Sequence, residues 1–87
     1  MGVPTEQQRR ERARSANAQG MAALRGGDHT AAIAAFREAI AADPTAGALV
    51  RNLAHALRIA GDDAGELATL ERALDLDRTD FVAQLRK

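Results

Sequence analysis

Apolar residues recur along the chain with the period of an α-helix. Two stretches place apolar side chains at i, i+3 and i+7, the spacing of one helical face: Ile33, Phe36 and Ile40, and later Leu67, Leu70 and Leu74. Alanines between these positions are small enough for a neighbouring helix to approach closely. The pattern predicts amphipathic helices that pack against one another.

Residues that start and stop helices divide this pattern into segments. Thr5 and Gln8 have the spacing of a capping box, and glycines at 26, 27 and 61 together with Pro44 end helical stretches. A second cap is expected from Asp63 with Glu66. The sequence predicts helices over residues 6–25, 30–42, 47–60 and 63–77, followed by a short last helix capped by Thr79-Asp80.

An 18-residue stretch, 27–44, recurs 34 residues later at 61–78. The shift aligns Gly27 with Gly61, Asp28 with Asp62, Phe36 with Leu70, Ala39 with Ala73, Ile40 with Leu74 and Asp43 with Asp77. A fixed period of this length is typical of a helical repeat array, in which each unit buries its apolar face against the next.

Gly20, Gly27-Asp28, Ala32, Phe36, Ala39 and Asp43-Pro44 together resemble the tetratricopeptide repeat, over roughly residues 13–80. The resemblance implies an all-α fold, an α-solenoid of two helical hairpins plus a short C-terminal helix. It divides the chain into a polar, partly helical extension (1–12), a first repeat (13–46), a second repeat (47–80) and the start of a capping helix or third repeat (81–87). The second repeat departs from the family pattern, because Glu66 replaces a small residue and Arg78 replaces the closing proline.

The C-terminal end of this array is expected to expose apolar surface. Arrays of this kind generally need about three repeats, and Phe81 and Leu85 would cover only part of the Leu67, Leu70 and Leu74 face. Either two copies pair through this end, which would make the chain a homo-oligomerisation module, or the sequence is part of a longer protein. Residues 70–81 also resemble the repeat segment that precedes the catalytic domain of bacterial aspartyl/asparaginyl hydroxylases, which would make the chain the protein-binding part of an enzyme.

The composition argues against several other classes of function. The chain has 87 residues, no Cys and no net charge, so neither disulfides nor bulk attraction to nucleic acid is expected. His29 and His55 lack metal-ligand spacing, and Ser15 lacks the glycines of a nucleophile elbow. No apolar run is long enough to span a membrane. We therefore expect a cytoplasmic protein that is not an enzyme and has neither a metal nor a cofactor.

The charges are divided between the helices. Residues 6–25 and 47–60 hold seven arginines and two glutamates, a net charge of +5. Residues 30–43 and 62–77 hold two arginines and eight acidic residues, a net charge of −6. In the family that the sequence resembles, the first helix of each hairpin lines the concave surface, so the resemblance implies a basic groove.

The candidate groove residues come from these first helices and from the C-terminus. They are Arg14, Asn17, Met21 and Arg25, then Arg51, Asn52, His55 and Arg58, and finally Arg86. Asn52 and Arg86 stand at positions of the family's carboxylate clamp, whereas Asn17, Met21 and Val82 differ from it. Because arginine forks suit carboxylates, the expected partner is a protein segment, either an extended acidic peptide or a chain's C-terminal carboxylate.

Overall fold

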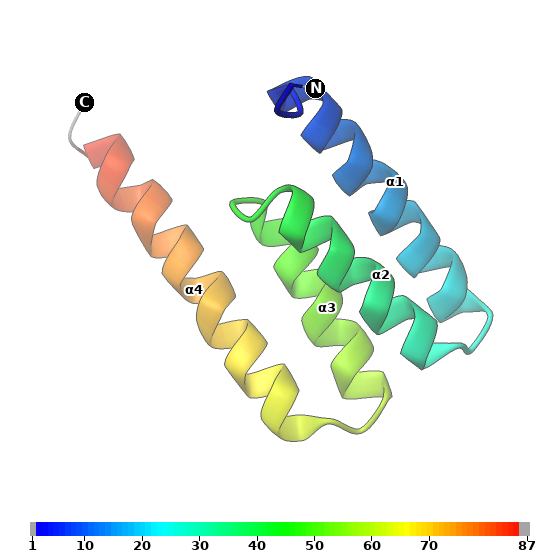
Figure 1. The fold of residues 1–87 in the computed structure, drawn as a ribbon. Coiled ribbons are helices and arrows are strands. Elements are labelled where there is room, and N and C mark those ends of the chain that lie inside the picture. The colour runs from blue at the N-terminus through cyan, green and yellow to red at the C-terminus, as the bar shows by residue number, and fades with distance from the viewer. Residues whose placement is uncertain (1, 86–87) are drawn as a thin grey trace.

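The computed structural model describes the backbone of residues 2–85 and the side chains of residues 2–76 and of Arg78. The described chain consists of four α-helices without strands: α1 (Glu6–Arg25), α2 (His29–Ala42), α3 (Gly47–Ile59) and α4 (Asp63–Leu85) (Figure 1). The all-α prediction is confirmed. The first three helices begin and end within one residue of their predicted bounds.

Local hydrogen bonds explain why the helices begin and end where they do. Thr5 and Gln8 form the predicted capping box, in which the Gln8 amide donates to Thr5 Oγ1 at 3.1 Å and the Thr5 amide donates to Gln8 Oε1 at 2.8 Å. Gly27 and Gly61 have φ values of 79° and 84°, the left-handed geometry that glycine adopts without steric cost. These two glycines end α1 and α3 in the same way, 34 residues apart.

The cap of α4 differs from the prediction by one residue. Asp62, rather than Asp63, accepts a hydrogen bond through Oδ1 from the Gly65 amide at 2.9 Å. The equivalent residue of the first hairpin, Asp28, accepts from the Ala31 amide at 3.1 Å in the same way. The repeat register was therefore a better guide to this cap than the local spacing of Asp63 and Glu66.

The predicted short fifth helix is wrong. The backbone of α4 is one helix of 23 residues from Asp63 to Leu85, so it includes residues 77–80, where a break was expected. The first hairpin ends at Pro44, whose ring prevents a helix from continuing, but the corresponding residue is Arg78. No glycine or proline occurs after Gly65, so nothing in the sequence of α4 stops the helix.

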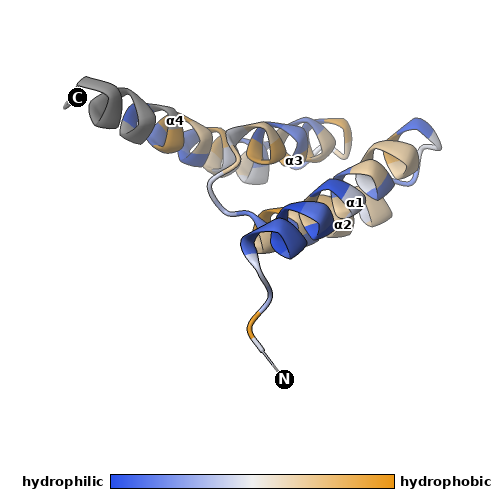
Figure 2. Cartoon of the chain, turned by 90° about the horizontal axis from the view of Figure 1, so that it is seen from above, coloured by the Kyte–Doolittle hydropathy of each residue, from blue (hydrophilic) through white to orange (hydrophobic). Residues whose placement is uncertain are grey.

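The helices stack in chain order. α1 packs on α2, α2 on α3 and α3 on α4, and Figure 2 shows α1 with α2 and α3 with α4 as two layers. α2 is covered on both sides, because it lies between α1 and α3. Among the described residues, α4 is packed mainly on α3.

Phe36 is fully buried, which agrees with its place on the apolar helical face that the sequence predicts. It and Val50 are the largest fully buried side chains among the described residues. Most of the other buried residues of α1 and α2 are small: Ala13, Ala16 and Gly20 in α1, and Ala32 and Ala39 in α2. A Cβ atom on Gly20 would lie 2.5 Å from the Phe36 ring, so only glycine allows α1 to approach α2 this closely.

Candidate binding surfaces

α1 and α3, the first helices of the two hairpins, run in the same direction (Figure 1). They meet at a hydrogen bond in which Asn52 Nδ2 donates to Asn17 Oδ1 at 2.8 Å. Both asparagine side chains are half-buried. Two of the predicted groove residues are therefore in direct contact, although they lie 35 positions apart in the sequence.

The other predicted residues of these two helices are exposed around this contact. Arg14, Met21 and Arg25 lie on the exposed side of α1, spaced by seven and four residues, and therefore along one stripe. Arg51, His55 and Arg58 form the corresponding stripe on α3. We call these six residues, together with Asn17 and Asn52, the α1–α3 face. Arg86 lies outside the described residues.

The α1–α3 face carries no negative charge of its own. There is no acidic residue in positions 12–25 or in α3. The two glutamates of α1 lie in its first half: Glu6 pairs with Arg10 at 2.6 Å, and Glu11 accepts from Gln7 at 3.2 Å. Side chains on this face can therefore offer hydrogen-bond donors and positive charge to a ligand.

The sequence analysis did not include Ile59 among the residues of the exposed surface of α3. This side chain is exposed at the end of α3, beside Arg58. Its position lies off the buried face that Val50, Leu53 and Leu57 define, and this spacing was a signal that it would be exposed. With Met21, it places exposed apolar area on the two helices that form the basic face.

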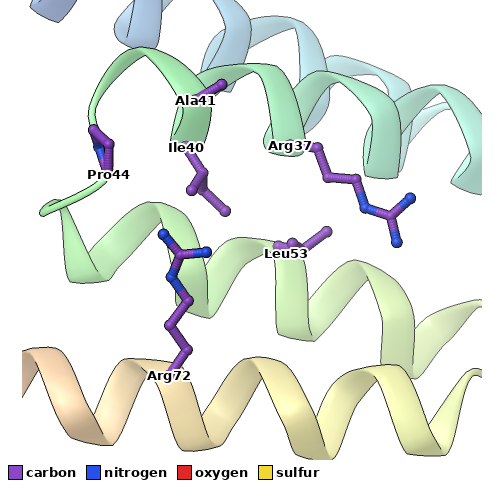
Figure 3. A pocket seen from close by; sticks show the side chains of 6 residues that line it. All are labelled: Arg37, Ile40, Ala41, Pro44, Leu53 and Arg72. Carbon is purple, nitrogen blue, oxygen red and sulfur yellow. The ribbon is translucent and has the colours of Figure 1, made fainter.

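A second surface, which the sequence did not suggest, is an open groove of about 370 Å³ between α2, α3 and α4. We call it the α2–α4 groove, and its lining residues are Arg37, Ile40, Ala41, Pro44, Leu53 and Arg72. Figure 3 shows Arg72 extending from α4 toward α2, with Ile40 and Leu53 between the helices and Arg37 at the other end. The only sequence signal was that Arg37 and Arg72 are the two basic residues of segments 30–43 and 62–77.

A smaller hollow of about 210 Å³ lies between the start of α1 and the loop that joins α2 to α3. Its lining includes Glu6, Arg10 and Asp43. Because Arg10 already pairs with Glu6 at 2.6 Å, this hollow offers less uncompensated charge than the other two surfaces.

The outer side of α4 exposes a row of leucines, which we call the α4 stripe. Leu67, Leu70 and Leu74 are 61%, 40% and 57% exposed. The repeat counterparts of Leu70 and Leu74 in α2 are buried: Phe36 is 0% exposed and Ile40 is 8% exposed. Ile33, the counterpart of Leu67, is partly buried. The difference arises because α3 covers α2, whereas no described helix covers this side of α4.

The expectation that a separate short helix with Phe81 and Leu85 would partly cover the α4 stripe is also wrong. Residues 81–85 continue α4 along the same axis, so their backbone does not turn back over the leucines. The side chains of Phe81 and Leu85 lie outside the described residues. Because α4 continues straight, the stripe is open in the described part of the chain.

Within residues 2–76 and Arg78, no group of three or more His, Asp or Glu side chains is placed to hold a metal ion. None of the described helices is both long enough and apolar enough to cross a membrane.

Comparison with known families addresses the first hairpin. Residues 13–45 match the family model described as tetratricopeptide repeat. The match supports the repeat family on the segment that contains Gly20, Phe36 and Pro44. No curated protein and no solved structure matches the chain.

Tetratricopeptide repeats generally mediate protein–protein interaction and usually act as non-catalytic scaffolds. The matched repeat contains α1 from residue 13 onward and all of α2, and α3 with α4 continues the helical stack. The match lies outside residues 70–81, on which the resemblance to the hydroxylase segment was based, so that resemblance stays a prediction.

Proposed function

We propose that this protein is a protein-interaction module that binds an extended acidic segment of a partner across the α1–α3 face. The observation that carries the proposal is the exposure of arginines on two parallel helices that touch through Asn17 and Asn52. A peptide lying along this contact would have cationic side chains on both sides.

The chemistry of the face favours a carboxylate ligand. Arg14 and Arg25 on α1 and Arg58 on α3 are exposed, and a guanidinium can donate two parallel hydrogen bonds to one carboxylate. The absence of acidic residues from positions 12–25 and from α3 means that bound carboxylates would meet little repulsion. The hydrogen bond from Asn52 Nδ2 to Asn17 Oδ1 uses one amide group of each side chain. The Nδ2 of Asn17 and the Oδ1 of Asn52 remain to bond a peptide backbone.

The test removes two arginines from this face and compares the result with removal of two arginines elsewhere. In the variant Arg25→Ala with Arg58→Ala, we expect the affinity for a glutamate-rich peptide to fall about tenfold, because exposed ion pairs each contribute up to about 1 kcal/mol. The control, Arg9→Ala with Arg12→Ala, removes the same charge from exposed positions outside the face. Fluorescence anisotropy at two salt concentrations measures both variants.

Equal loss in both variants would mean that net charge, rather than this face, controls binding, and would contradict the proposal. A peptide with an amidated C-terminus separates the two expected ligands. If internal carboxylates are recognised, amidation leaves the affinity unchanged, whereas a carboxylate clamp requires the free C-terminus.

A second candidate function is self-association through the α4 stripe. It is favoured by the exposure of three leucines at positions whose counterparts in α2 are packed against another helix or buried. We expect a concentration-dependent dimer in sedimentation experiments, which Leu70→Glu with Leu74→Glu abolishes without loss of helicity. A monomer at all concentrations would remove this candidate and leave the α1–α3 face unaffected.

A further inference from the structure

We infer that the α2–α4 groove is a second docking site, for a partner segment in which acidic residues flank an apolar side chain. The groove is separate from the α1–α3 face. Leu53 in the groove and His55 on the face lie two residues apart on α3, and therefore about 200° apart around the helix axis. A ligand in the groove would contact α2 and α4, which contribute nothing to the α1–α3 face.

The middle of the groove suits an apolar side chain. Ile40 and Leu53 are mostly buried, and their small exposed parts line the groove. Ala41 and Pro44 add further apolar surface from the end of α2 and the following turn. The volume of about 370 Å³ is at the lower end of the range for small-molecule sites and is large enough for one or two aliphatic side chains. Covering this surface would remove apolar area from water, which favours binding.

The two arginines of the groove suit carboxylates. Arg37 from α2 and Arg72 from α4 are exposed, and neither forms an ion pair with another described residue. Figure 3 shows the Arg72 guanidinium beside Ile40 and the Arg37 guanidinium on the far side of Leu53. No acidic residue is among the described residues that line the groove.

The negative charge of the surrounding helices favours binding of an acidic segment in the groove over binding elsewhere on α2 and α4. Segments 30–43 and 62–77 carry eight acidic residues and only these two arginines, and both arginines line the same groove. The rest of these helices would repel an acidic partner. An acidic segment would therefore be attracted to the groove and not to the neighbouring surface, and its apolar side chain would fix its position along the floor.

The experiment uses two acetylated and amidated hexapeptides, one with two leucines between glutamates and the other with two serines in their place. We expect the wild-type chain to bind the leucine peptide at least about tenfold more tightly than the serine peptide, because only leucine buries apolar area. We expect Arg37→Ala with Arg72→Ala to weaken binding of the leucine peptide about tenfold. Amide chemical shifts recorded on the same samples locate the ligand on α2 and α4.

The variant Arg25→Ala with Arg58→Ala separates this inference from the proposed function. If it binds the leucine peptide as the wild type does, the groove is independent of the α1–α3 face. The inference is overturned if this variant loses the leucine peptide, if Arg37→Ala with Arg72→Ala binds normally, or if both peptides bind equally. All three arginine pairs used here and above are exposed, and circular dichroism checks that each variant is folded.

Discussion

At the scale of single residues, the fold depends on a contact between the largest buried side chain and a position that has none. The Phe36 ring lies against Gly20, where a Cβ atom would come within 2.5 Å of it. The side chain of Phe36 is fully buried. Because many of the other core residues are alanines, the apolar area of this one side chain is a large share of what holds α1 and α2 together.

Two residues in equivalent repeat positions should differ in their effect on stability. Phe36→Ala should lower the free energy of unfolding by about 3–5 kcal/mol, because it empties a fully buried site. Leu70→Ala, 34 residues later, should cost less than about 1.5 kcal/mol, because Leu70 is 40% exposed. Urea denaturation followed by circular dichroism measures both values. Similar losses would contradict the different environments of α2 and α4.

Many of the structural features of single residues could be predicted from the sequence. The capping box at Thr5, the helix-ending glycines and the burial of Phe36 each depend on residues close in sequence or on the helical period. The exposure of Leu70 and Leu74 was expected from the small number of repeats and not from the spacing of the leucines, which is the same for a covered face and an open one.

At the scale of elements, α4 differs most from its counterpart. α2 has 14 residues and ends before Pro44, whereas α4 has 23 residues and continues through Arg78. A break was expected because the first hairpin has one at this register. The repeat period predicts where equivalent residues lie, but a helix ends only where the local sequence stops it.

A proline at position 78 tests whether α4 is continuous there. Arg78→Pro should lower the helical signal at 222 nm, because proline removes the hydrogen bond to the residue 74 carbonyl and its ring clashes with the preceding turn. Arg78→Ala, which keeps the amide, should leave the signal unchanged. If the proline variant shows the same helicity as the wild type, α4 does not continue through this position.

At the scale of the whole molecule, stacking two hairpins produces three surfaces with different chemistry. The α1–α3 face is basic, the α2–α4 groove combines two arginines with apolar surface, and the α4 stripe is apolar. The zero net charge of the whole chain conceals this division, because most of the positive residues and most of the negative residues lie on different helices. Net charge alone would therefore give no reason to expect an acidic partner.

The sequence suggested the residues of one of these surfaces, the α1–α3 face, and missed another. The contact between Asn17 and Asn52 follows from the repeat, which places the first helices of the two hairpins side by side. The α2–α4 groove needs the relative positions of three helices and a turn. Periodicity places side chains around one helix but gives no distance between helices, so Arg37 and Arg72 could not be brought together from the sequence.

The most direct test of the central claim is to map a glutamate-rich peptide without apolar residues onto the protein by amide chemical shifts. The account predicts that the largest shifts lie along α1 from Arg14 to Arg25 and along α3 from Arg51 to Arg58, and that they disappear in Arg25→Ala with Arg58→Ala. Shifts confined to α2 and α4, or an unchanged map in that variant, would contradict the assignment of the α1–α3 face as the binding surface.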